Sequence, residues 1–258
     1  MRVCPLLSFL DTMWYRAKFR DDPPARQGDF SFHLDRFWSF LQSLRPEDKG
    51  LSQWWLKGWT EQEARLFPVF EQDGTPTATA LAVLTNEYLG SEQEPKEIDM
   101  WNGRLDGLAP ASVSLDMDDD DYAGNAVDLT IGGFEASPPW LASVEAHLQM
   151  VSGLARTYKP YYVMAGSRAY FSKAVFEDKP GVNWMLYLPQ EITARQVPEA
   201  EALVAVDDAR GRRLGTIVVS VADEVFSADN PRHVEAANHI EIRLVDQDLL
   251  PSYADFRR

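Results

Sequence analysis

The chain has 258 residues, and its 40 Asp and Glu residues outnumber its 25 Lys and Arg residues, which gives a formal net charge of −15. Because nucleic acids and anionic membrane surfaces attract basic proteins, this charge disfavours both as partners and favours a basic protein. The 45% content of hydrophobic residues is ordinary for a folded protein. One cysteine, Cys4, excludes an intrachain disulfide and fits a reducing compartment.

The N-terminal segment predicts a strand followed by a helix. Residues 6–19 are apolar and aromatic with partial alternation, which is typical of a strand rather than of a signal peptide. Asp29 can cap a helix over residues 30–45, where apolar residues recur every three or four positions. No apolar stretch approaches the ~20 residues that span a bilayer, so we expect a cytoplasmic protein.

Two helices are predicted between residues 60 and 90. Thr60 and Glu63 form a T-x-x-E capping box, which predicts a helix of two to three turns through Phe70. Thr75 is followed by a proline, a pattern that favours a second helix start. That Ala- and Leu-rich helix is expected to stop at Gly90, a good residue for the position after a helix end.

The middle of the chain predicts a meander of three strands and a long helix. The strands are expected at residues 98–104, 112–117 and 126–132, where apolar and polar residues alternate most clearly in the last two. An amphipathic helix is expected over residues 138–158, with Ser137 as its cap.

The last hundred residues are rich in strand patterns, with a short helix around residues 230–238. The expected strands cover residues 161–165, 182–188, 203–206, 214–221 and 240–245. Helices and strands are mixed without a regular βαβ rhythm, so the fold class is α+β, with a mainly antiparallel sheet packed against amphipathic helices. We expect a single domain over residues 1–258, with a possible subdivision near residue 135.

The most acidic segment reads LDMDDDDY. A run of charge is most often a solvated surface loop. Its spacing does not match a calcium loop, because no glutamate closes it. The remaining interpretation is a recognition surface for a basic partner. The residues concerned are Asp116, Asp118, Asp119, Asp120, Asp121 and Tyr122.

The sequence contains no compact catalytic or metal-binding motif. His33 and His147 are expected on the polar faces of helices, and His233 and His239 lack the spacing of a zinc site. Ser167 lies in AGSRAYF, which lacks the order of a nucleophile elbow. We therefore predict no catalytic residue, no metal and no cofactor.

The tryptophans fall into two groups. Trp38 and Trp140 lie on amphipathic segments and are expected in the core. Trp54, Trp55 and Trp59 cluster near a loop, where core packing and contact with a partner both remain open, because Trp is enriched at the centres of interfaces. We include Trp54 and Trp55 with the acidic run as candidate partner-binding residues.

Five segments carry a resemblance to a known family: WYRAKF, QWWLKG with its T-x-x-E helix, DGTPTATALA, GVNWMLYLP and the late I-x-I-R-L. In these segments the chain resembles the immunity protein 52 family, whose members are cytoplasmic antidotes in bacterial polymorphic-toxin and type VI secretion systems. The resemblance implies one α+β protein without enzymatic activity. It also implies a cognate toxin as partner, commonly a nuclease of the restriction-endonuclease type.

Two alternatives stay open at this point. One is a hydrolase whose divalent-metal site is dispersed over the fold, for instance at Asp99, Asp116 and Asp118. The other is a chaperone or adaptor for an effector of a secretion system. Oligomeric state, strand order and the identity of the toxin are beyond the sequence.

Overall fold

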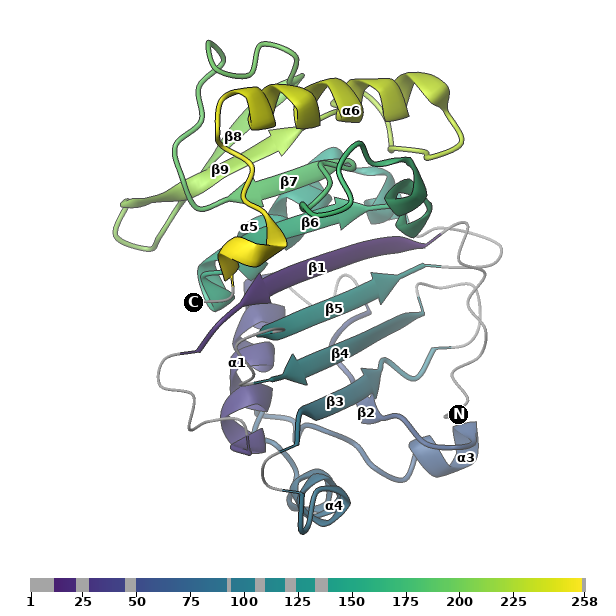
Figure 1. Ribbon diagram of the computed structural model, residues 1–258. Coiled ribbons are helices and arrows are strands. Elements are labelled where there is room, and N and C mark those ends of the chain that lie inside the picture. The colour runs from purple at the N-terminus through teal and green to yellow at the C-terminus, as the bar shows by residue number, and fades with distance from the viewer. Residues whose placement is uncertain are drawn as a thin grey trace.

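One antiparallel sheet forms the centre of the fold (Figure 1). The structure, a computed structural model, describes residues 12–21, 28–44, 50–91, 94–104, 110–118, 124–132 and 139–256. Within these residues the sheet has nine strands in the order β2-β3-β4-β5-β1-β6-β7-β9-β8. Their bounds are Met13–Phe19 (β1), Trp55–Leu56 (β2), Lys96–Trp101 (β3), Ala111–Met117 (β4), Asn125–Ile131 (β5), Tyr162–Gly166 (β6), Met185–Leu188 (β7), Ala202–Asp207 (β8) and Arg213–Val219 (β9).

The larger helices pack on the sheet or along its end. In Figure 1, α1 and α5 lie behind the strands, and α6 runs along the end formed by β7, β9 and β8. The helices are Phe30–Ser43 (α1), Glu61–Ala64 (α3), Ala78–Glu87 (α4), Val144–Tyr158 (α5) and Pro231–Asp246 (α6), with short 3-10 helices at Pro139–Ala142 (η2), Arg168–Lys173 (η3) and Tyr253–Phe256 (η4).

The α+β prediction is confirmed, and so is most of its strand pattern. The predicted meander is present as β3, β4 and β5, with Ile98 opposite Leu115 and Leu115 opposite Val127. The predicted N-terminal strand is described as β1, while residues 6–11 and Cys4 lie outside the described residues. Strands from both sides of residue 135 belong to the same sheet. The single-domain organisation stays a prediction.

The predicted helix through Phe70 is wrong beyond its first turn. The predicted cap is present, since Thr60 Oγ1 accepts the Glu63 N–H at 3.2 Å, while the Glu63 carboxylate accepts the N–H of Trp59 rather than that of Thr60; α3 ends at Ala64. The chain then becomes extended at Pro68, which cannot donate a helical hydrogen bond. There it pairs with the β2 segment, where the Leu56 N–H donates to the Phe67 carbonyl at 3.0 Å.

Two helix starts were also predicted in the wrong place. The cap of α4 is Thr77 rather than Thr75, because Thr77 accepts the Ala80 N–H while Pro76 pairs with Phe70. The helix ends at Glu87, before Gly90. The cap of α5 is Ser143, which accepts the Ala146 N–H; the expected cap, Ser137, lies outside the described residues.

The predicted strand at residues 240–245 is wrong. These residues form the second half of α6, which begins after Asn230 and continues to Asp246. The predicted short helix at 230–238 is its first half. Ala237, Ile240 and Leu244 are buried at a spacing of three or four residues, which gives the helix one apolar face. This tertiary packing outweighs the strand propensity of the β-branched residues in the segment.

The core lies behind the sheet under α1 and α5 (Figure 1), and at β6 and β7 residues of both faces are buried. Trp38 and Trp140, predicted in the core, pack against it while remaining partly exposed. His33 and His147 are buried, so the prediction that they lie on polar helix faces is wrong. In the described part of the chain, no helix has the length and apolar character needed to cross a bilayer.

Candidate functional site

One face of the first half of the sheet has no described helix across it (Figure 1). In β4 and β5, buried residues alternate with partly exposed polar ones, as expected for a sheet covered on one side only. We call the outward-pointing residues of β1, β3, β4 and β5 the open face. Its polar residues are Arg16, Lys18, Glu97, Asp99, Ser112, Ser114, Asp116, Asp128 and Thr130, and the buried rings of Trp14 and Trp101 lie on the same face.

Part of the charge on the open face is paired. Arg16 and Asp128 lie opposite each other on β1 and β5, 3.3 Å apart, and Asp128 also accepts the indole N–H of Trp14 at 3.0 Å. Asp99 of β3 pairs with Lys57 at 2.8 Å. These pairs fix the carboxylates in place, but partly exposed pairs stabilise a fold only modestly.

A second group on the open face has an excess of negative charge. Glu97 and Asp116 face each other across β3 and β4, which juxtaposes like charges. The Ser114 hydroxyl lies 2.8 Å from Glu97 Oε1 and 2.9 Å from Asp116 Oδ1, and its single proton serves only one of them at a time. Burial raises the pKa of Asp116, an effect that the nearby Asp128 carboxylate reinforces. The Ser114 hydrogen bond and the cations Arg16 and Lys18 act in the opposite direction on Asp116.

The acidic run begins at the end of β4, beside this group. Asp118 follows the strand, and its backbone N–H donates to Asn125 Oδ1 at 2.9 Å. Asp119, Asp120, Asp121 and Tyr122 lie outside the described residues. The structure thus brings Asp116 and Asp118 to the open face and leaves the rest of the run as a prediction.

The three clustered tryptophans have different environments. Trp54 is 2% exposed and donates its indole N–H to the Leu51 carbonyl at 2.7 Å, so it packs in the core. Trp55 lies on β2 with its ring 6.4 Å from that of Trp101. Trp59 is 57% exposed, the most exposed of the three. The structure therefore separates one core residue from one residue that is available at the surface.

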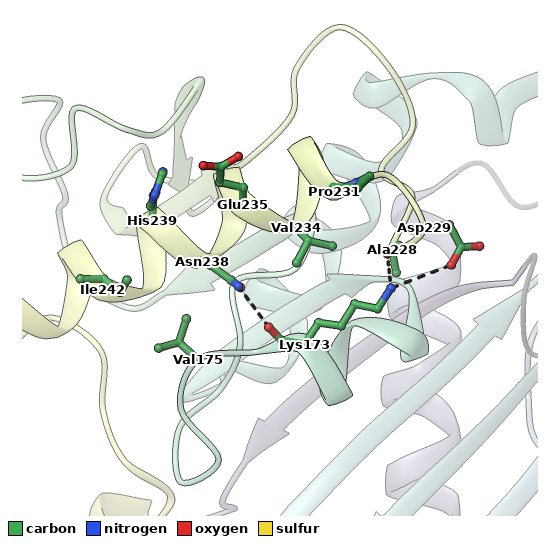
Figure 2. A pocket seen from close by; sticks show the side chains of 10 residues that line it. All are labelled: Lys173, Val175, Ala228, Asp229, Pro231, Val234, Glu235, Asn238, His239 and Ile242. Carbon is green, nitrogen blue, oxygen red and sulfur yellow. Dashed lines mark hydrogen bonds and ion pairs between the residues drawn. The ribbon is translucent and has the colours of Figure 1, made fainter.

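A groove lies near the other end of the sheet, between α6 and the segment after η3 (Figures 1 and 2). Its volume is about 500 Å³, and its apolar lining includes Val175, Val234 and Ile242. At one end, Lys173 bonds to the Ala228 carbonyl, so its ammonium group is already occupied. The exposed lining is mostly apolar, and α6 adds the polar side chains of Glu235, Asn238 and His239.

A buried carboxylate supports one wall of this groove. Glu241 is 1% exposed and accepts hydrogen bonds from the Tyr170 hydroxyl at 2.6 Å and from the backbone N–H groups of Val175 and Val182, both at 2.9 Å. Burial, reinforced by Glu241, raises the pKa of Tyr170, so the tyrosine remains a donor. Sequence reasoning missed this residue, because it read residues 240–245 as a strand.

The remaining candidates have structural roles. Ser167 caps η3 by accepting the Ala169 N–H. His233 accepts the Ser227 N–H through Nδ1 and contacts Glu224 through Nε2 at 2.8 Å, which occupies both ring nitrogens.

Among the described residues, no three His, Cys, Asp or Glu side chains are placed to hold a metal ion. The dispersed metal site considered at Asp99, Asp116 and Asp118 gains no support from their geometry. Asp99 is engaged by Lys57, while Asp116 contacts the Ser114 hydroxyl.

Comparison with known proteins gives a family. No curated protein matches the chain. A solved structure of a Pseudomonas aeruginosa T6SS protein aligns with a TM-score of 0.43 and 13% sequence identity, over 88% of this chain and 76% of that one. Residues 25–252 match the sequence model of Immunity protein 52, which covers most of the chain. The chain therefore belongs to the immunity protein 52 family.

Proposed function

We propose that this protein is an immunity protein that binds a cognate toxin and silences it in a stoichiometric complex. The observation that carries the proposal is the match of residues 25–252 to the immunity protein 52 family. Binding requires no chemistry from the protein itself, which is consistent with the structural roles of the candidate nucleophiles and histidines described above. Cytoplasmic location and a type VI secretion system as the toxin's route remain predictions.

We propose further that the toxin presents a basic, nuclease-like surface. A nuclease must place cations against phosphates, and a protein with a net charge of −15 is complementary to such a surface. Glu97 and Asp116, held by the Ser114 hydroxyl, place two of the carboxylates on the open face. Complementary charge would accelerate encounter, while buried aromatic contacts would set the lifetime of the complex.

Co-expression tests the proposal. A cell that produces the toxin domain encoded beside this gene should stop growing, and production of this protein should restore growth. A catalytically dead toxin domain is the control, and it should still be recovered in a pull-down with this protein. Equal killing with and without the protein would contradict the proposal, and transfer of the complex to a secretion apparatus without loss of toxicity would favour an adaptor.

The acidic run gives a sharper prediction. Replacing Asp118, Asp119, Asp120 and Asp121 by Asn should slow association with the toxin, because local charge steers the encounter. The wild-type rate should fall as ionic strength rises through ~0.15 M, where the screening length is ~8 Å, and the variant should respond less.

A matched control removes four exposed carboxylates elsewhere. The residues are Glu177, Asp223, Glu235 and Asp246. Stopped-flow kinetics measures all three proteins. Identical rates for the two variants would show that net charge matters and that the acidic run does not.

A further inference from the structure

The two edges of the sheet differ in how they end. At one edge lies β2, which has two residues, and the chain folds back along it, where the Leu56 N–H donates to the Phe67 carbonyl at 3.0 Å. At the other edge lies β8, at the end of the sheet beside α6 (Figure 1). Residues 202–206 of β8 include no lysine or proline, the residues that commonly protect an exposed edge strand.

The hydrogen bonds of β9 show which backbone groups of β8 point outward. Just after β9, the Ser220 N–H donates to the Trp184 carbonyl on the β7 side at 3.0 Å. Since the direction alternates from residue to residue, Val219 and every second residue before it point to β8. Their partners on that strand are Ala202, Val204 and Val206. The N–H and C=O groups of Leu203 and Ala205 therefore point away from the sheet.

These outward groups form a short stretch that is closed at both ends. Within the described residues, no other segment forms a hydrogen bond with the backbone of Leu203 or Ala205. Before the stretch, the Glu201 N–H turns inward to a carbonyl of β9 at 3.0 Å, and after it the Asp207 carbonyl accepts from Arg156 Nε at 2.8 Å. Ala205 is exposed and Leu203 is partly exposed, so two donors and two acceptors are available at a defined place.

We propose that β8 pairs antiparallel with β8 of a second copy of this chain, which joins two sheets into one. This inference goes beyond the proposed function and does not depend on it. With the two-fold axis at Val204, Leu203 of each copy lies opposite Ala205 of the other. Each such pair exchanges two backbone hydrogen bonds, so every available donor and acceptor is used.

The closed ends select this register. Pairing Leu203 with its own counterpart would place Ala205 opposite Glu201, whose N–H is turned away. Pairing Ala205 with its own counterpart would place Leu203 opposite Asp207, whose carbonyl is occupied. Only the register centred on Val204 leaves both ends as they are and pairs everything between them.

Charge at the two ends of β8 favours a second copy as the occupant. Glu201 is exposed, and within the described residues its carboxylate accepts the Ala222 N–H at 2.6 Å without forming an ion pair. In the proposed register it meets Asp207 of the second copy, where Arg213 pairs with that carboxylate at 2.7 Å and Arg156 supplies another guanidinium. Each glutamate thus approaches an end with one excess cation, twice per dimer. Repulsion between copies of net charge −15 is screened beyond ~8 Å at ~0.15 M salt.

Sedimentation velocity over a range of protein concentrations tests the proposal. The wild type should pass from monomer to dimer with a Kd on the order of 10 µM, as expected for a small interface. Ala205→Pro should raise this Kd at least about tenfold, because proline removes an outward donor and its ring occupies the place of the second strand. A wild type that stays monomeric well above that Kd would overturn the proposal.

Ala209→Pro is the matched control. Ala209 is the second residue of a turn in which the Gly211 N–H donates to the Asp208 carbonyl at 3.0 Å, a position that favours proline. This variant keeps the outward groups of β8 and should dimerise like the wild type, and urea denaturation checks that both variants fold. Equal Kd values for Ala205→Pro and the wild type would overturn the proposal.

Hydrogen exchange tests the same edge without any variant. The amides of Leu203 and Ala205 should become protected as the protein concentration rises, whereas those of Val204 and Val206, which bond to β9, should not change. Exchange at Leu203 and Ala205 that is independent of concentration would overturn the proposal. Protection that appears only with an inactive toxin domain would overturn it too, because the edge would then receive a strand of the toxin.

Discussion

The two halves of the sheet differ in what covers them. In β6 and β7 every residue is buried, and so are the last five residues of β9, because the chain packs against both faces there. In β4 and β5 burial alternates, because only one face is covered. The segment MLYL and the segment SVSLDM show this difference directly in their composition.

The two halves of the sheet differ in how much their side chains contribute to stability. The doubly covered half contains large buried side chains such as Trp184 and Tyr187, whose removal would leave cavities. The open half has charged groups that tolerate change, since water reaches them. We infer that stability depends mainly on the covered half, while the open half contains charged groups available for the recognition proposed above.

Trp184→Ala should have the largest effect on stability. Trp184 is fully buried, and its indole N–H donates to the Val221 carbonyl at 2.7 Å. We expect the free energy of unfolding to fall by about 3–5 kcal/mol, measured by urea denaturation. Trp59→Ala, the exposed control, should change it by less than about 0.5 kcal/mol. Similar losses of unfolding free energy for the two variants would contradict the inference that stability depends mainly on the covered half.

Acid should destabilise the protein through His147, which lies behind the sheet on α5. Its Nε2 contacts the Leu141 carbonyl and must carry the proton, so Nδ1 accepts from the Tyr15 hydroxyl. Burial lowers the pKa of His147 to about 4. The histidine of the unfolded chain binds a proton below pH ~6.5, whereas the folded protein binds it only near pH 4. The free energy of unfolding is therefore highest above pH ~6.5 and falls as the pH approaches 4.

The expected loss from His147 alone is about 3 kcal/mol across this window. Denaturation curves between pH 7 and pH 4 measure it, and His147→Gln should remove that part of the pH dependence. An unchanged slope in the variant would show that other groups are responsible.

Asp128→Asn should have the smallest effect of the three. Asn keeps the acceptor for Trp14 and loses the charge that attracts Arg16; the Arg16 and Asp128 side chains are 32% and 14% exposed. We expect a loss of about 0.5–1 kcal/mol in the free energy of unfolding. A loss above about 3 kcal/mol would show that the open face is as protected as the core and would contradict the comparison.

The spacing of apolar residues and the residues that cap helices made much of the fold predictable. Alternation identified β4 and β5, and Asp29 was recognised as the cap of α1. The failures have tertiary causes. Residues 240–245 read as a strand because Ile and Val favour one, yet they continue a helix whose buried face includes Glu241. A carboxylate on the buried face of a helix breaks the amphipathic pattern, and no local signal reveals its three donors.

The acidic binding surface inferred from the sequence stays a prediction. Charge pointed to an acidic surface, and Asp116 does lie on the open face. The sequence could not show which tryptophan of the cluster is buried, because Trp54 and Trp59 lie in one short segment without a clear period, yet one is buried and the other exposed. That division depends on how closely Gly58 approaches α3, which is a property of the folded chain.

Titrating the protein into the cognate toxin domain, with cleavage of plasmid DNA as the readout, tests the central claim most directly. The account predicts that cleavage falls in proportion to added protein and ends at one equivalent. Full cleavage in the presence of excess protein would contradict it.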